Sequence, residues 1–264
     1  MARNRLASAP AAPWRWAGAG LLLGLALALV LFAPARWLAA RVSAATGGQV
    51  LLQDARGTVW NGSAQLVLTG GPGSSDAAAL PSRVQWRLRP APGGVHAVLA
   101  TDCCTPEPLA LDWRLGWNSR SLRLSDGRSQ WPASLLTGLG TPWNTLQLEG
   151  ELALRTDSLL LQWAQGRLSV AGQAELTAER MGSRLTTLRP MGSYRLVLSG
   201  GDVPMLQLST LDGPLRLSGT GQWVASRLRF NGEASAAPER EAALANLLNI
   251  IGRRSGSRSI ITLG

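Results

Sequence analysis

Lysine is absent from the 264 residues, and each of the 26 basic side chains is an arginine. A P-loop needs a lysine at the phosphates of its nucleotide, and an enzyme that forms a Schiff base needs a side-chain amine. The sequence therefore excludes both of these classes of protein.

Cysteine and histidine are almost as scarce. The two cysteines, Cys103 and Cys104, are neighbours, and His96 is the single histidine. An adjacent pair provides no disulfide framework, although a vicinal disulfide is possible in an oxidising compartment. Asp102 and Glu107 flank the cysteines but indicate a metal site only weakly, because zinc mostly takes Cys and His ligands. We expect a loop with two small apolar thiols, no metal and no cofactor.

Motifs for catalysis are also missing. No Gly-x-Ser-x-Gly elbow occurs, and any Ser-His or Cys-His pair would have to use His96, which lies in the strand-like run 95–99. A catalytic pair of carboxylates remains an alternative, because the fold and not the sequence spacing decides which two carboxylates lie close together. The candidates fall mostly on the polar side of predicted strands and are Asp112, Glu149, Glu151, Glu175 and Glu233. We predict that the chain is not an enzyme.

The N-terminal region contains a long uncharged run. Twenty residues from Trp16 to Ala35 have no charge, which is the length that a helix needs to cross about 30 Å of hydrocarbon. The flanking arginines are Arg3, Arg5, Arg15, Arg36 and Arg41. We predict a cytoplasmic tail over 1–15, a single transmembrane signal anchor over 16–37 and a periplasmic β-rich domain over 38–264. A cleaved signal peptide is the alternative, because Ala-Pro-Ala at 33–35 suits cleavage.

The net charge of +10 is concentrated at the N-terminus. Residues 1–41 contain five arginines and no acids, which leaves 21 arginines against 16 acids spread along the rest of the chain. An arginine and tryptophan surface could bind single-stranded nucleic acid. We predict no nucleic-acid partner, because the domain is expected to be translocated and its tryptophans fall mostly on the apolar side of strands.

Apolar and polar residues alternate after about residue 48, which predicts half-buried strands. About a dozen such runs, separated by Gly, Pro and Asp turn signals, predict a mainly β chain folded as an antiparallel meander. This arrangement gives one apolar face, which closes as a sandwich or barrel, packs on helices or stays partly open as a groove for a partner. The candidate residues of that groove are Val84, Trp86, Leu88, Leu111, Trp113 and Leu115.

The stretch GTVWNGSAQL predicts the first hairpin. Asn61-Gly62 between two alternating runs is the strongest short signal for a two-residue type I′ turn. With this turn, Val59, Ala64 and Leu66 would share one face of the hairpin.

Residues 238–252 predict an amphipathic helix that begins with Pro and acids and ends at Gly252, followed by a strand over 259–263. Its apolar face consists of Leu244, Leu247, Leu248 and Ile251, spaced as i, i+3, i+4 and i+7. This face either plugs one end of the sheet or docks a partner helix, so its residues are candidates for partner docking.

The order of these features resembles that of the type II secretion system protein N family. The segments that support the resemblance are the arginine-bearing tail and anchor, 34–38, 57–62, 140–150, 190–194, 213–221 and 247–254. The resemblance implies a single-pass protein of the Gram-negative inner membrane with its domain in the periplasm. It also implies a non-enzymatic part of the machine that exports folded exoproteins through an outer-membrane secretin, with other secretion-system proteins as partners.

A hypothesis of another class stays open. A long antiparallel sheet behind an inner-membrane anchor also resembles the groove domains of AsmA-like proteins, which bind or transfer lipids along an apolar sheet face. A lipid is therefore a second candidate partner.

Overall fold

The computed structural model describes residues 14–201, 203–224 and 227–264. Most of the predicted cytoplasmic tail, with Arg3 and Arg5, lies outside the described residues. The helices are α1 (Trp14–Leu31), α2 (Ala35–Ala45), η1 (Ala133–Leu139), α3 (Trp143–Leu146), η2 (Pro238–Arg240) and α4 (Glu241–Ile251). The strands are β1 (Val50–Gly57), β2 (Asn61–Thr69), β3 (Ala77–Ala91), β4 (Gly94–Thr101), β5 (Leu109–Leu115), β6 (Ser119–Leu124), β7 (Gly127–Pro132), β8 (Leu148–Ala164), β9 (Arg167–Ser183), β10 (Gly192–Gly201), β11 (Met205–Asp212), β12 (Leu215–Val224), β13 (Arg227–Ala236), β14 (Arg253–Ser255) and β15 (Arg258–Leu263).

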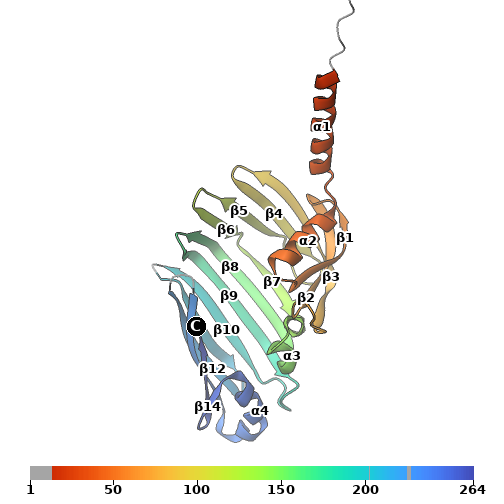
Figure 1. The fold of residues 1–264 in the computed structure, drawn as a ribbon. Coiled ribbons are helices and arrows are strands. Elements are labelled where there is room, and N and C mark those ends of the chain that lie inside the picture. The colour runs from red at the N-terminus through yellow and green to blue at the C-terminus, as the bar shows by residue number, and fades with distance from the viewer. Residues whose placement is uncertain (1–13, 202, 225–226) are drawn as a thin grey trace, which may run out of the picture.

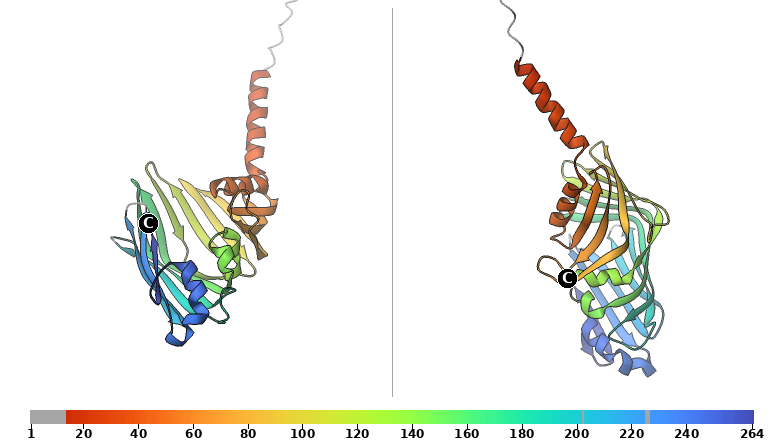
Figure 2. Two further views of the ribbon diagram at one scale, coloured as in Figure 1. Left: turned by 60° about the horizontal axis from the view of Figure 1, so that its bottom comes forward. Right: turned by 90° about the vertical axis from the view of Figure 1, so that its right-hand side faces the viewer.

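These strands form one open antiparallel sheet of fifteen strands in the described part of the chain. Strand order follows the sequence from β1 to β6 and from β8 to β13, which confirms the mainly β meander. Two strands depart from that order. Strand β7 pairs with the first half of β8, whereas β6 pairs with the last residues of β8. Strand β14 forms the edge of the sheet beyond β15. Figures 1 and 2 show the sheet curving round, with α2, α3 and α4 on its inner side.

The sequence-based assignment missed β7, β9 and β14. β9 alternates Ala, Gln, Glu and Thr, so its apolar pattern is weak, and β14 has three residues that are all exposed. The alternating run Leu146-Gln147-Leu148 predicts that a strand includes Leu146, and this is wrong, because Leu146 is the last residue of α3. Gln147 follows at a φ of 41°, which ends the helix, and β8 starts only at Leu148.

The first hairpin forms as predicted, but its turn does not lie at Asn61-Gly62. Both residues belong to β2, and Gly57 pairs with Gly62. The chain reverses through Thr58, whose backbone N–H donates to the carbonyl oxygen of Asn61 at 2.9 Å and whose Oγ1 accepts from the N–H of Asn61 at 3.1 Å. Gly57 supplies the left-handed conformation (φ 86°) that this turn needs. Val59 therefore lies in the loop and not on the face that Ala64 and Leu66 share.

The predicted span over 16–37 is divided between two helices. Helix α1 ends at Leu31, and α2 begins at Ala35 with Pro34 as its extended N-cap residue. None of the helices in residues 14–201, 203–224 and 227–264 has the length and apolar character needed to cross a membrane.

The buried core lies on the inner side of the sheet in three clusters. The largest joins β8, β9, β10, β12 and β13 to η1, α3 and α4, and includes Tyr194 and Leu215. A second packs Ala35 of α2 against Ala64 and Trp86, and a third surrounds Leu80. The helices thus cover β1 to β3 and one end of the later strands.

Candidate interaction surface

The strand registers place the six predicted groove residues on one face of the sheet. Trp86 pairs with Leu99, Leu88 with Ala97, and Ala97 in turn with Leu111. Their exposure is graded along this face. The Trp86 side chain is 4% exposed, Val84, Leu88, Leu111 and Trp113 are half-buried, and Leu115 is 56% exposed.

The buried part of the face is covered by helices of this chain. Trp86 packs with Ala35 of α2, and its indole N–H donates to the carbonyl oxygen of Val59 at 3.0 Å. Val84 packs against the cluster that contains Leu80 and Leu135, and Leu135 is a residue of η1. This part of the predicted groove is therefore occupied.

The uncovered part runs from β5 across β6 to the end of β8. Trp113 pairs with Leu122, which pairs with Leu161. Trp113 and Trp163 lie with ring centroids 6.2 Å apart. A shallow depression of about 620 Å³ between the β5–β6 and β8–β9 loops is lined by both rings, and by Leu115, Trp117, Arg120 and neighbouring residues. Apolar surface is thus available to a partner at this end of the sheet.

The predicted C-terminal helix is present as η2 and α4. Leu244, Leu247 and Leu248 are 0% exposed and lie in the largest cluster, and Ile251 packs against it. The face predicted for docking therefore contacts this chain's own sheet, as expected if the helix plugs one end of the sheet. Docking of a partner through this face stays a prediction, and the burial of its leucines does not favour it.

Helix α1 joins the sheet through the β1–β2 loop. The indole N–H of Trp60 donates to the carbonyl oxygen of Val30 at 2.7 Å, near the C-terminal end of α1, where carbonyls lack helical partners. The backbone N–H of Val59 donates to the carbonyl oxygen of Ala33 at 2.8 Å. The sequence predicted this loop only as a turn; its role as the attachment point of α1 needed the structure.

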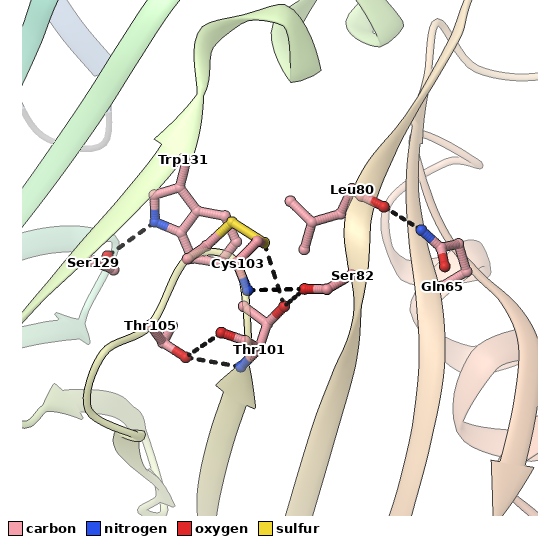
Figure 3. Close-up of a disulfide and its surroundings, with 9 residues drawn as sticks. Gln65, Leu80, Ser82, Thr101, Cys103, Thr105, Ser129 and Trp131 are labelled. Atoms are coloured by element: carbon pink, nitrogen blue, oxygen red, sulfur yellow. Dashed lines mark hydrogen bonds between the residues drawn. A yellow bond between two sulfur atoms is a disulfide. The ribbon is translucent and has the colours of Figure 1, made fainter.

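Cys103 and Cys104 form a vicinal disulfide in the loop between β4 and β5 (Figure 3). The backbone N–H of Cys103 donates to Ser82 of β3 at 3.0 Å, and the carbonyl oxygen of Cys104 accepts from the N–H of Gln130 of β7 at 2.7 Å. Cys104 is 2% exposed and packs beside Leu80 and Trp131. The loop therefore connects β3 with β7, two strands that do not pair with each other in the sheet.

The weak indication of a metal site at this loop is not supported. The two sulfurs are bonded to each other, so neither is a free thiolate for a metal. In the described part of the chain no group of three or more His, Cys, Asp or Glu side chains is placed to hold a metal ion.

His96 lies on the polar face of β4. Its Nδ1 is 2.9 Å from Oδ1 of Asp112 on β5, the residue that it pairs with in the sheet. Both side chains are more than a third exposed. Of the candidate carboxylates, Glu175 lies 3.1 Å from Nε of Arg195, and Glu149 lies 3.3 Å from Nη1 of Arg189. These contacts fit solvated surface pairs, of which His96–Asp112 and Glu175–Arg195 join neighbouring strands, whereas Arg189 lies in the connection between β9 and β10.

An arginine pair also stabilises the bulge in β1. Arg56 and Arg83 approach Oδ2 of Asp54 at 2.8 and 2.9 Å, and Asp54 has a φ of 49° at the register shift with β2. The hydrogen bond from Arg56 and then that from Arg83 hold the pKa of Asp54 below its usual value. Nothing in the sequence signalled this pairing, because Arg83 is 29 residues away.

The described residues thus place the chain among proteins built on one open antiparallel β meander, with an apolar face that helices cover only in part. The family model for type II secretion system (T2SS), protein N, matches residues 48–261, and the chain belongs to this family. The resemblance seen in the sequence is thereby confirmed. Neither a curated protein nor a solved structure matches the chain.

Proposed function

We propose that the chain is a non-enzymatic inner-membrane component of the type II secretion system. It contributes to the export of folded exoproteins across the outer membrane through protein–protein contacts in the periplasm. The family match over residues 48–261 is the observation that carries the proposal. The uncovered apolar surface around Trp113 supports a role in binding, because large exposed apolar patches favour interaction sites.

Membrane attachment through the N-terminal region is a separate element of this proposal. The uncharged run 16–35 and the exposed leucines of α1, such as Leu21 and Leu23, support it. Alkaline extraction of membranes should leave the chain in the pellet, and protease added to spheroplasts should cut residues beyond 38. Recovery of the chain in the soluble fraction would contradict the attachment.

Site-specific photo-crosslinking in secreting cells tests the proposed contacts. A photoreactive residue at Trp113 probes the uncovered face, and one at Arg123 is the matched control. Arg123 is exposed and pairs with Asp112, so it lies beside Trp113 but on the opposite face. Adducts from position 113 to other secretion-system proteins, without equal adducts from 123, are expected. Normal exoprotein release after deletion of the gene, together with no protein adduct from 113, would overturn the proposal.

A lipid-binding role on the same face is the second candidate. The half-buried side chains of Leu111, Trp113, Leu122 and Leu161 line up across the three strands β5, β6 and β8 without a helix over them, which favours an apolar ligand. Mass spectrometry of the purified chain, released from its detergent into native conditions, tests this role. A stoichiometric phospholipid that disappears in Trp113→Glu would support it. Adducts to lipid and to no protein from position 113 in cells would also favour it over the first proposal.

A further inference from the structure

We infer that the hairpin tips at one end of the sheet form a binding surface for an anionic lipid bilayer. This tip surface consists of exposed apolar residues surrounded by arginines. Its apolar members are Leu115, Trp117, Trp163, Val203, Met205 and Val224. Its basic members are Arg114, Arg120, Arg167 and Arg227. The inference goes beyond the proposed secretion function and does not depend on it.

Antiparallel pairing brings these residues to one end of the sheet. The connections β5–β6, β8–β9, β10–β11 and β12–β13 all lie at that end, because β5, β8, β10 and β12 run in the same direction. Figure 1 shows the β5–β6 and β8–β9 hairpins ending along the same side of the curved sheet. The tip surface is therefore a row contributed by four separate connections.

Each of the four connections exposes at least one large apolar side chain. Trp117 of the β5–β6 connection has a relative exposure of 106%, so its indole contacts almost nothing in the chain. Val203 and Val224, from the next connections along the row, are each 49% exposed. Exposing apolar residues singly is ordinary, but their repetition along one end of a sheet is a signal of an interface.

The charge of these tip segments is almost entirely positive. Arg114 and Arg120 flank Trp117, Arg167 follows Trp163, and all three arginines are exposed. Ion pairs involving the four arginines of the tip surface are not found among the residues that the structure describes. The tip segments 113–120, 163–168, 201–205 and 223–228 contain one acid in sequence, Asp202, which lies outside the described residues. The surface is therefore complementary to an anionic partner.

The opposite end of the sheet differs from the tips in the exposure of its apolar side chains and in its charge. Helices η1, α3 and α4 cover its apolar side chains, and Leu247 and Leu248 are fully buried there. Its connections mix acids with arginines, as in Glu149 with Arg189. Leu211 and Ile250 are also exposed at that end, at 44% and 41%, so the tips are distinguished by a row of exposed apolar side chains together with arginines outside the ion pairs of the described residues.

A bilayer fits this combination better than a protein partner. Tryptophan prefers the region of lipid headgroups, and arginine binds phosphate with several donors. Helix α1, with its exposed leucines, is attached at the same end of the sheet. The β1–β2 loop, which binds the carbonyl oxygens of Val30 and Ala33, lies at this end. The carbonyl oxygen of Trp60 in this loop accepts a hydrogen bond at 2.7 Å from the N–H of Leu88, near the end of β3. The tip surface therefore continues from the apolar helix, and both would face one membrane.

Nitroxide labelling of the full chain in vesicles tests this inference. Asn118→Cys places the label at the β5–β6 tip and keeps Trp117, and Thr187→Cys places it at an exposed position between β9 and β10, at the opposite end. Labelling is done without reductant, so that Cys103 and Cys104 stay bonded. In vesicles of equal parts phosphatidylglycerol and phosphatidylcholine, the label at 118 should become accessible to oxygen and protected from an aqueous nickel reagent. The label at 187 should stay aqueous.

Charge variants separate the tip surface from any insertion of α1. Arg114→Gln, Arg120→Gln and Arg167→Gln should each lower the ratio of lipid-immersed to aqueous label at 118 about fivefold. The same change at Arg240, Arg253 and Arg254, exposed arginines of the opposite end, should leave that ratio unchanged. An aqueous label at 118, immersion equal in pure phosphatidylcholine, or protection that needs an added secretion protein would overturn the inference.

Discussion

The indole ring of Trp86 lies over the α-carbon of Gly62, its pairing partner on β2. A Cβ built at Gly62 would lie 2.6 Å from Cζ2 of this ring and 2.6 Å from the carbonyl oxygen of Arg56. Gly62 is therefore needed for close packing inside the sheet and not for a turn. Trp86 also packs in one cluster with Ala35 of α2, so the close contact at Gly62 lies directly beneath this helix.

Replacing Gly62 by Ala should destabilise the chain by about 1–3 kcal/mol, because the added methyl overpacks this contact. Urea unfolding followed by tryptophan fluorescence measures the change. Gly182→Ala is the matched control within β9, since the nearest atom to its new Cβ is 3.7 Å away. Equal stability of the two variants would show that the ring moves aside freely.

Leu247 tests whether α4 is part of the core. Its side chain is 0% exposed, so Leu247→Ala should cost about 2–5 kcal/mol of unfolding free energy by leaving a cavity. Ile250, on the same helix, is 41% exposed, and Ile250→Ala should change stability by no more than about 0.5 kcal/mol. Thermal or urea unfolding of the two variants provides the comparison. A Leu247→Ala variant as stable as the parent would return this face to the role of a docking surface.

The two cysteines offer a paired test of the disulfide loop. Cys103→Ser and Cys104→Ser remove the same bond, but Cys103 is exposed and Cys104 is 2% exposed beside Leu80 and Trp131. Burying a hydroxyl at position 104 should make Cys104→Ser less stable than Cys103→Ser by about 1–3 kcal/mol. Urea unfolding under identical non-reducing conditions measures the difference. Identical midpoints for the two variants would argue against the packed position of Cys104.

Tyr194 should make stability depend on alkaline pH. Burial raises the pKa of Tyr194 above its ordinary value of 10.0, and its hydroxyl donates to the carbonyl oxygen of Leu215 at 3.2 Å. Above pH 10 the unfolded chain loses this proton while the folded chain keeps it. The contribution to stability is therefore complete below pH 10 and decreases as the pH rises, by up to about 1.4 kcal/mol per pH unit.

The amino-acid composition allows the ionisation of Tyr194 to be measured separately from that of other side chains. The absence of lysine removes the other side chain that ordinarily titrates near pH 10. Tyr194 is the single tyrosine, so absorbance of the phenolate at 295 nm reports on one residue. It should appear only with unfolding, and Tyr194→Phe should abolish the decrease in stability between pH 10 and 11.5. Ionisation of Tyr194 in the folded chain at its ordinary pKa would contradict its burial.

Local patterns identified most of the elements of this chain. Alternation with a period of two marked most strands, and the Gly, Pro and Asp turn signals marked connections that the structure contains, such as Pro92-Gly93 between β3 and β4 and Gly213-Pro214 between β11 and β12. These signals succeed because side-chain alternation and turn conformations depend on neighbouring residues. Strands with weak alternation, such as β9, were missed because their pairing, and not their own pattern, makes them strands.

The sequence by itself determined a mainly β meander, the apolar face of each strand and the amphipathic helix near the C-terminus. Only the tertiary structure decided what covers that face. Trp86 and Trp113 have the same alternating pattern, yet Trp86 is buried beneath α2 and Trp113 lies beyond it. The alternation of apolar and polar residues indicates which side chains lie on the same face of the sheet. What lies over them depends on contacts between segments far apart in the chain, which no local pattern contains.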